Sequence, residues 1–430
     1  MKVKVIGGGL AGCEAAYQLL KRGFAVDLYE MRPVAATGAH RTDHLAELVC
    51  SNSLKSDLVD TSSGLLKAEM RLLDCLLLQC AEVVKVPAGG ALAVDREAFS
   101  AEVSRRLAQF DKLCVVRQEV TSIDYDEPTI IATGPLTSAA LAAQIKAFAG
   151  ESMSFCDAVA PIVAADSLDY TRCFAASRYG KGDADYVNCG MNREEYLAFY
   201  EALVGAECVQ DKLIDATFYE NCMPIEVMAK RGVDAMRYGP LRPVGIRGPE
   251  GEKYYAVLQL RKENMAGDAY NLVGFQTNLK FGEQKRVFGL IPGLGNAEYM
   301  RYGVMHRNTY INAPKVLDMT FMLREHPGVY VAGQLSGVEG YMESTMSGLV
   351  AGLMMARRLA GKAPLMPDEY TMIGALARYV SNESIEWLEP MNSNFGLLPS
   401  ITDVRDKKLR KAAYAQRALE HMKLYIQQLD

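Results

Sequence analysis

The chain has 430 residues, half of them hydrophobic, and a formal net charge of −5 at pH 7. This length allows two domains or one large domain with an insertion, and the mildly acidic charge gives no basic footprint for a nucleic-acid partner. No stretch reaches the roughly 20 apolar residues of a membrane span, and the apolar run at the N-terminus is too short for a secretory signal, so we expect a cytoplasmic protein with no membrane contact.

The first thirty residues predict a strand, a turn, a helix and a second strand. An apolar strand over 3–6 runs directly into the glycine-rich turn 7–12, and a helix follows that ends at Gly23. A second apolar strand over 25–29 ends on an acidic residue, Glu30. This order is the structural context in which a glycine-rich turn binds a dinucleotide.

The turn has the Gly-x-Gly-x-x-Gly spacing, and each glycine has a physical role. Gly7 permits the tight turn, Gly9 lets the backbone approach a pyrophosphate, and Gly12 lets the helix pack closely on the strand. The helix N-terminus adds free N–H groups and a partial positive charge. An acid at the end of the second strand accepts hydrogen bonds from a ribose, which favours FAD or NAD over NADP. The alternative is an ordinary glycine-rich turn. We expect cofactor contacts from Gly7, Gly8, Gly9, Leu10, Ala11, Gly12 and Glu30.

The segment 31–60 lacks the periodicity of a packing element and contains a polar loop with His40 and His44. Two histidines four residues apart can bind a metal, but a loop near a phosphate or a solvated loop is the favoured interpretation, and we expect no metal site. The loop leads into Cys50. Leucines at helical spacing then predict one long amphipathic helix over 65–78.

Later strands are expected to return the chain to the sheet begun by residues 3–6. Short apolar runs over 113–116 and 129–132 precede a buried run that ends in Gly333, and a helix over 344–359 follows. Many FAD enzymes close over the ribityl chain with such a strand, glycine and helix, so we expect Gly333 to contact the cofactor. Many of them carry an acid after this glycine. Here the residue is Gln334, so we expect no carboxylate contact at this position.

The middle of the chain has more tyrosines and shorter apolar runs, and a helix there begins with the capping-box pair Asn192 and Glu195. We therefore predict an α/β fold: a Rossmann-like FAD-binding domain of the glutathione-reductase-like type with an inserted α+β domain. The FAD-binding domain is expected over 1–150 and 291–430, and the inserted domain over 151–290.

The last predicted helix, over 404–423, is strongly basic. A solvated surface helix is slightly favoured over a nucleic-acid-binding face. Its basic residues are Arg405, Lys407, Lys408, Arg410, Lys411, Arg417 and Lys423.

Ten cysteines are spread along the chain without a Cys-x-x-Cys pair, which argues against a structural zinc site and a redox dithiol of the usual spacing. Two of them lie outside any apolar periodicity. Cys222 directly precedes a helix that Pro224 is suited to begin, a position that lowers the pKa of a thiol. Cys50 precedes a polar run with Lys55 nearby. A buried structural thiol is the default interpretation of each.

Seven segments carry a resemblance to a known family: 7–12, 47–54, 222–226, 239–245, 302–308, 333–343 and 394–399. They resemble the folate- and FAD-dependent tRNA (uracil-5-)-methyltransferases, the TrmFO family. The likeness spans nearly the whole chain, and the two cysteine segments are its most specific parts. One departure is Asn221, where the family has a glycine before the cysteine, and it affects loop flexibility more than chemistry.

The resemblance implies methylation of carbon 5 of the T-loop uridine (position 54) in tRNA. Methylenetetrahydrofolate is the implied carbon donor, and reduced FAD, itself reduced by NAD(P)H, is the implied hydride donor. A thiolate that adds to carbon 6 of uracil makes carbon 5 nucleophilic. Cys222 is expected in this role, and Cys50 as general base or as protection for the reactive flavin species, although the two roles could be exchanged.

The implied partner is the T arm of tRNA, with no obligate protein partner. We expect Arg and Lys side chains of the inserted domain and of the helix 404–423 at its phosphates, and an aromatic side chain stacked on the exposed base.

Other functions remain open from the sequence. The same chemistry could act on ribosomal RNA. Wobble-uridine modification of the GidA/MnmG type needs a long C-terminal helical domain, which we do not expect here. A flavin-dependent oxidoreductase of small molecules would keep its turnover in a Cys222→Ala variant, and a non-enzymatic FAD-binding scaffold would have no turnover at all.

Overall fold

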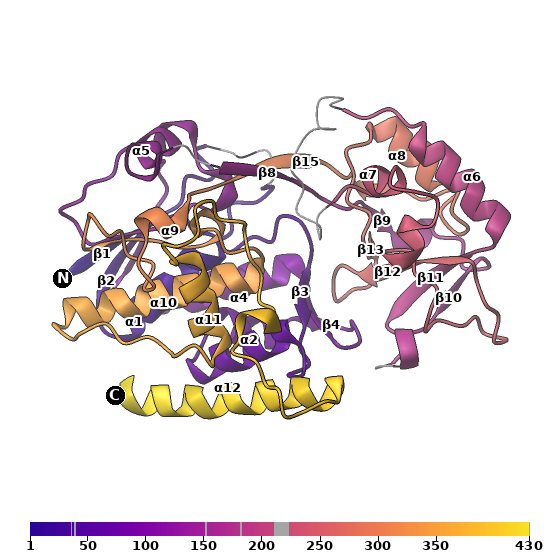
Figure 1. The fold of residues 1–430 in the computed structure, drawn as a ribbon. Coiled ribbons are helices and arrows are strands. Elements are labelled where there is room, and N and C mark those ends of the chain that lie inside the picture. Colours follow the sequence, from indigo (N-terminus) through magenta and orange to yellow (C-terminus); the bar gives the residue numbers. More distant parts are fainter. Residues whose placement is uncertain (36, 38–39, 151–152, 181–182, 210–222, 430) are drawn as a thin grey trace.

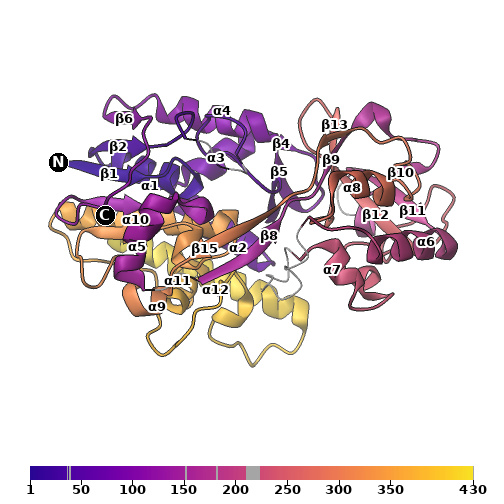
Figure 2. The same ribbon diagram turned by 90° about the horizontal axis from the view of Figure 1, so that it is seen from above.

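The computed structural model of the protein describes residues 1–35, 37, 40–150, 153–180, 183–209 and 223–429. These residues form two domains joined by a two-stranded antiparallel ribbon (Figure 1). The ribbon pairs β8 (Met153–Ala158) with β15 (Met305–Tyr310). Seen from above, it crosses from one domain to the other (Figure 2).

The first domain, called here the parallel-sheet domain, is built on a five-stranded sheet in the order β16-β7-β1-β2-β6. Every neighbouring pair in this sheet is parallel. The strand predicted near the N-terminus lies at its centre, and the predicted later strands return to it, which confirms the α/β fold class. The strands are β1 (Lys2–Ile6), β2 (Ala25–Tyr29), β6 (Leu113–Val116), β7 (Thr129–Ile131) and β16 (Val329–Val331).

Two helices of this domain, α1 (Leu10–Lys21) and α10 (Tyr341–Leu359), pack against each other along much of their length. Glycines on α10 make this close approach possible. A Cβ atom on Gly348 would lie 2.1 Å from the Ala11 carbonyl oxygen, and one on Gly352 would lie 2.7 Å from the Ala15 carbonyl oxygen. Contact at this distance needs residues without side chains, so the two glycines set how closely α10 approaches the glycine-rich turn.

The predicted long helix over 65–78 is wrong. The structure has α2 (Ser62–Leu72) and α3 (Leu76–Val83), separated by a left-handed Asp74 with φ of 60°. The break between the two helices is caused by a tertiary contact. The buried carboxylate of Glu14 on α1 accepts hydrogen bonds from the backbone N–H groups of Leu76 and Leu77, which begins a second helix there.

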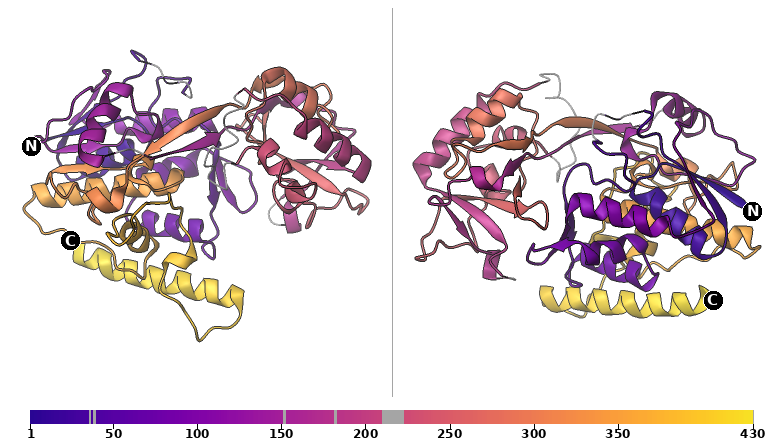
Figure 3. Two further views of the ribbon diagram at one scale, coloured as in Figure 1. Left: turned by 45° about the horizontal axis from the view of Figure 1, so that its top comes forward. Right: turned by 180° about the vertical axis from the view of Figure 1, so that it is seen from behind.

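Other elements complete this domain. They include the three-stranded sheet β3-β5-β4 (Ser53–Ser56, Ala91–Val94, Lys85–Val86) and the helices α4 (Arg96–Leu107), α5 (Ala139–Ala149), α9 (Ala313–Val316) and α11 (Met372–Val380). The last helix, α12 (Lys407–Leu429), packs on α2 and runs along the outside of the domain (Figure 3). It begins three residues later than predicted, where the Asp406 carboxylate accepts the N–H groups of Lys408 and Leu409.

The inserted domain is built on a six-stranded antiparallel arrangement in the order β10-β11-β12-β13-β9-β14. Its apolar core runs from Val163 to Ala297, slightly beyond the expected boundary at 290. The predicted capping box of Asn192 and Glu195 is confirmed at the start of α6. The elements are β9 (Ile162–Ala164), β10 (Cys173–Ala175), β11 (Tyr186–Met191), β12 (Ala256–Lys262), β13 (Ala269–Leu272), β14 (Tyr299–Arg301), α6 (Arg193–Val204), α7 (Ile225–Ala229) and α8 (Phe281–Phe288).

None of the helices that the structure describes is long and apolar enough to cross a membrane.

Candidate cofactor and thiol site

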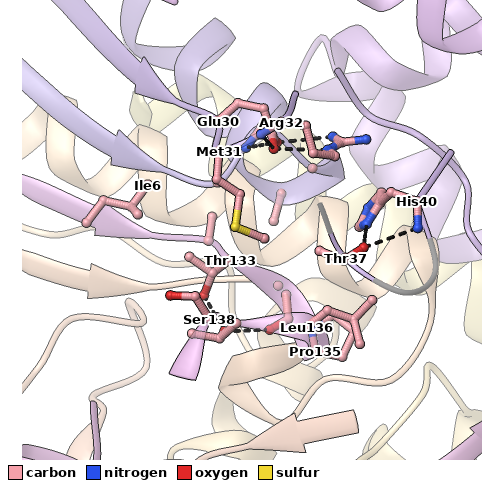
Figure 4. Close-up of a pocket in the computed structure, with 18 of the residues that line it drawn as sticks. Ile6, Glu30, Met31, Arg32, Thr37, His40, Thr133, Pro135, Leu136 and Ser138 are labelled. Carbon is pink, nitrogen blue, oxygen red and sulfur yellow. Dashed lines mark hydrogen bonds and ion pairs between the residues drawn. The ribbon is translucent and has the colours of Figure 1, made fainter. Parts of the chain in front are cut away.

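A large cavity opens at the carboxyl ends of the parallel strands, with a volume of about 1030 Å³ including the solvent at its mouth. Its wall is formed by the turn after β1, the end of β2, the segment after β7 and the start of α10, and Figure 4 shows Glu30, Thr133 and Ser138 around it. This edge of a parallel sheet is where ligands of doubly wound folds bind. Of the expected cofactor residues, those that line the cavity are Gly7, Gly8, Gly9, Leu10, Ala11, Glu30 and Gly333.

The glycines of the turn differ in what surrounds them. Gly7 has φ of 107°, and a Cβ atom there would lie 2.4 Å from the carbonyl oxygen of Ala132. A Cβ atom on Gly12 would lie 1.9 Å from the carbonyl oxygen of Gly7, so Gly12 packs the turn and does not face the cavity. Gly9, the residue before α1, has no protein atom within 4 Å of such a Cβ. The space beside Gly9 and the helix N-terminus fit a pyrophosphate.

Glu30 is buried at the end of β2, and its carboxylate is held by hydrogen bonds. Gly8 N–H donates to Oε2 at 3.1 Å, and the Arg32 guanidinium donates to Oε1 from Nε at 2.9 Å. Arg32 also donates from Nη1 to Glu47 at 2.9 Å. Burial opposes ionisation of Glu30, but the hydrogen bonds from Arg32 outweigh it and lower the pKa of this carboxyl below its ordinary value. The acid is therefore ionised and fixed in place at the cavity wall. Sequence reasoning missed Arg32, although it lies only two residues away.

The polar loop closes one side of the cavity. His40 pairs through Nδ1 with the hydroxyl of Thr37 at 2.5 Å, and both residues line the cavity (Figure 4). Among the described residues, no group of three or more His, Cys, Asp or Glu side chains is arranged to hold a metal ion.

Gly333 lies two residues after the end of β16, next to the helix pair. Its φ is 78°, and its N–H donates to the Ser347 hydroxyl at 2.7 Å. A Cβ atom there would lie 3.2 Å from the side chain of Ala11. Gln334, which stands where many flavin enzymes have an acid, donates from Nε2 to the Glu339 carboxylate at 2.6 Å. The amide of Gln334 at the cavity wall is therefore held by a buried carboxylate five residues away.

Cys50 lies beside the cavity, half-buried, on the segment before β3. The hydroxyl of Tyr341 donates to the Cys50 sulfur at 3.0 Å and accepts the Cys50 N–H at 2.7 Å. Tyr341 is the first residue of α10 and lines the cavity. The structure thus brings a thiol of segment 47–54 to the cavity wall through a residue 291 positions later in the chain. Cys222 lies outside the described residues, so the meeting of the two thiols stays a prediction.

Three arginines that the sequence did not single out hold the Cys50 segment. Arg301 donates from Nη2 to the carbonyl of Val49 at 2.7 Å, and Arg96 donates to the carbonyl of Leu48. Arg261 donates from Nη2 to the Ser51 hydroxyl at 2.9 Å. The available signal was weak: a charged residue inside an apolar strand, such as Arg261 in β12, needs a buried partner.

With this geometry in place, the chain can be compared with known proteins. The family model of glucose inhibited division protein A matches residues 2–363. A methylenetetrahydrofolate–tRNA-(uracil-5-)-methyltransferase TrmFO of Syntrophomonas wolfei is 55% identical over 98% of each chain. The TrmFO of Listeria innocua is 53% identical over 99% of each chain. This chain belongs to the TrmFO family.

The fold is shared more widely than the sequence. The structure of GidA from Aquifex aeolicus aligns with a TM-score of 0.72 at 16% identity, covering 99% of this chain and 73% of that one. It shows that the two proteins have the same fold. Within this TrmFO chain, three of the family-like segments, 7–12, 47–54 and 333–343, meet at or beside this cavity.

Proposed function

We propose that this chain methylates carbon 5 of the T-loop uridine (position 54) in tRNA, with methylenetetrahydrofolate as carbon donor, FAD as redox cofactor and NAD(P)H as its reductant. The observation that carries the proposal is the placement of the Cys50 sulfur beside a dinucleotide-type cavity, through a hydrogen bond to the cavity residue Tyr341. The names of full-length relatives at 51–55% identity support the same reaction.

The residues of the cavity fit FAD. The α1 N-terminus beside Gly9 would hold the pyrophosphate, the ionised Glu30 would accept from the ribose hydroxyls, and Gly333 would lie next to the ribityl chain. When bound and reduced, FAD supplies a hydride to the one-carbon unit.

The two thiols have different roles in the remaining steps. Cys222 adds to carbon 6 of the pyrimidine, which makes carbon 5 nucleophilic towards the one-carbon unit. Cys50 removes the carbon 5 proton as general base, and Tyr341 orients its sulfur by donating to it. Loss of this proton expels the tetrahydrofolate nitrogen and leaves an exocyclic methylene on the base, which is still bonded to Cys222 at carbon 6. Reduction of this methylene to methyl then expels the Cys222 thiolate.

The tRNA surface is proposed to include the exposed face of α12. Arg410 and Arg417 of this helix donate to backbone carbonyls of their own domain, whereas Lys407, Lys408 and Lys411 are exposed. We place the protein in the cytoplasm, acting without an obligate protein partner.

The decisive experiment uses tRNA whose T-loop uridine is replaced by 5-fluorouridine, because fluorine at carbon 5 cannot leave as a proton would. The wild-type protein is expected to be yellow and to trap a covalent complex with this tRNA. The Cys222→Ala variant should form none, and Cys50→Ala should still form an adduct but fail to methylate ordinary tRNA.

Cys114→Ala is the matched control, because this thiol is exposed on β6 away from the cavity. It should keep both activities. Covalent trapping that survives in Cys222→Ala would contradict the assignment of the nucleophile, and methylation of ribosomal RNA in preference to tRNA would redirect the substrate.

A further inference from the structure

The three arginines around Cys50 come from distant parts of the fold. Arg96 is the first residue of α4 in the parallel-sheet domain, whereas Arg261 lies on β12 and Arg301 ends β14, both in the inserted domain. They donate hydrogen bonds to the residues on both sides of Cys50, from Leu48 to Asn52. The segment that carries Cys50 is therefore held from both domains at once.

Two of these arginines are buried, and the side chain of Arg96 is 13% exposed. Arg261 is 6% exposed and Arg301 is 7% exposed. Arg96 forms an ion pair with Glu263, with Nε 2.6 Å from Oε1. The Nε atom of Arg301 is buried without a hydrogen-bond partner among the described residues. Three largely buried cations thus surround the Cys50 segment, and the Glu263 carboxylate forms an ion pair with one of them, Arg96.

Burial and the neighbouring charges shift the pKa values of all three arginines. Burial and the neighbouring Arg96 lower the pKa of Arg301 to about 10. Burial also lowers the pKa of Arg261, whereas Glu263 offsets the burial of Arg96 and raises its pKa. The Cys50 sulfur lies within electrostatic range of Arg96 and Arg261, and an anion at that position favours both cations. The attraction is reciprocal, so the same cations favour the thiolate.

We propose that Arg96, Arg261 and Arg301 are positioning residues that fix the Cys50 segment and hold the Cys50 sulfur as a thiolate at neutral pH. The inference rests on the proposed function, in which Cys50 accepts a proton and must therefore be deprotonated beforehand. Because two of the three cations belong to the inserted domain, the basicity of the site depends on the contact between the domains.

The other charged and titratable groups near the segment fit this arrangement. Tyr341 donates to the sulfur, and burial raises the pKa of its hydroxyl, so it stays a donor. Lys55 Nζ lies 3.5 Å from the buried carboxylate of Glu343, and these two charges offset each other. Glu263 is engaged by Arg96. Arg41 adds a cation near Arg301, and the Tyr186 hydroxyl lies near Arg261. Glu263 is the carboxylate that acts on all three arginines.

The test measures the pH dependence of Cys50 alkylation in the purified holoprotein without RNA. Timed pulses of iodoacetamide between about pH 5 and pH 10 are followed by trypsin and mass spectrometry, because only the thiolate reacts. Trypsin releases residues 42–55, in which Cys50 is the sole cysteine, and residues 113–117, in which Cys114 is an internal reference. Arg301→Gln removes a cation, Arg301→Lys keeps it, and Arg105→Gln removes an exposed cation elsewhere on α4.

Arg301→Gln is expected to move the alkylation midpoint of Cys50 upward by about one pH unit, which lowers the rate about tenfold at pH values well below the midpoint. Arg301→Lys should keep the wild-type midpoint to within a few tenths, and Arg105→Gln should not change it. If Arg301→Gln does not fold, Arg261→Gln and Arg261→Lys form the equivalent pair.

Two results would overturn the inference. Unchanged midpoints in the glutamine variants would show that the arginines do not hold the thiolate. Equal shifts in the lysine and glutamine variants would assign them to packing alone. Neither result depends on methylation, so failure here is distinct from failure of the proposed function, which the 5-fluorouridine experiment reports.

Discussion

The two domains contribute to the site in different ways. The parallel-sheet domain contributes the turn 7–12, Gly333 after β16 and the helix start at Tyr341, all at one edge of one sheet, together with the Glu30 carboxylate. The inserted domain contributes side chains, since Arg261 and Arg301 extend from antiparallel strands to the Cys50 segment. A parallel sheet places the loops after its strands at one edge. The inserted domain has an antiparallel sheet, and it reaches the Cys50 segment through long, charged side chains.

The junction between the domains is polar and specific. Asn52 is fully buried, and its Nδ2 group donates to Val94 O in the parallel-sheet domain at 3.0 Å and to Lys262 O in the inserted domain at 2.9 Å. Its Oδ1 atom accepts from Arg261 Nε at 2.9 Å. One amide thus ties both domains to the residue two positions after Cys50, which makes the relative placement of the domains part of the site.

The largest expected effect tests the backbone contribution. Gly12→Ala places a methyl group 1.9 Å from the Gly7 carbonyl oxygen, so we expect loss of bound flavin and a decrease in unfolding free energy of about 3 kcal/mol. Flavin absorbance and chemical denaturation measure the two effects.

Gly9→Ala is the matched control, because no protein atom lies within 4 Å of its new methyl group. It should fold with wild-type stability and bind flavin more weakly. Equal losses of stability in both variants would contradict the distinction between a packing glycine and a cofactor-facing one.

The second prediction tests the contact that Asn52 makes between the two domains. Asn52→Ala removes the donor to three backbone carbonyls and the acceptor of Arg261 Nε, so we expect the unfolding free energy to fall by about 2–3 kcal/mol. Denaturant titration measures it. The exposed Asn296→Ala, in the inserted domain, should stay within about 0.5 kcal/mol of wild type. A similarly small change in Asn52→Ala would show that the amide does not hold the domains together.

The third effect concerns support of the Cys50 region from within the parallel-sheet domain. Lys67 is fully buried and donates from Nζ to the carbonyls of Leu54 and Ser63. Burial lowers its pKa to about 8. Between pH 8 and the ordinary lysine value the unfolded chain binds more protons than the folded protein, so the unfolding free energy rises with pH.

Relative to Lys67→Met, the wild type should therefore gain about 2 kcal/mol between pH 8 and pH 10. Denaturation of both proteins across this range measures the difference. The exposed Lys362→Met is the control and should follow the wild-type curve. Parallel curves for wild type and Lys67→Met would contradict a lowered pKa at this position.

The smallest effect asks whether the parallel-sheet domain also contributes to RNA binding through α12. Replacing Lys407, Lys408 and Lys411 together by Glu should reduce the slope of log affinity against log salt by about 2, because each lost phosphate contact removes roughly 0.7–0.9. Filter binding of tRNA at several salt concentrations measures the slope. The triple Lys→Arg variant should keep it, and an unchanged slope in the Glu variant would assign RNA binding to other surfaces.

Sequence reasoning succeeded where the contributing residues are neighbours. The strand, turn, helix and acid within the first thirty residues lie in the structure where they were predicted, because sterics and hydrogen bonds within a turn depend on adjacent residues. The helix predicted over 65–78 failed for the opposite reason. Its break at Asp74 is imposed by Glu14, which lies 62 residues before Leu76.

The sequence by itself thus determined the fold class and the geometry of the glycine-rich turn, and it singled out the two cysteine segments. Only the tertiary structure decided what surrounds Cys50. Arg261 and Arg301 lie more than 200 residues away from the segment they bind. Such contacts depend on how two sheets are placed, and a charge on a strand carries no local signal of the partner it will meet across a domain boundary.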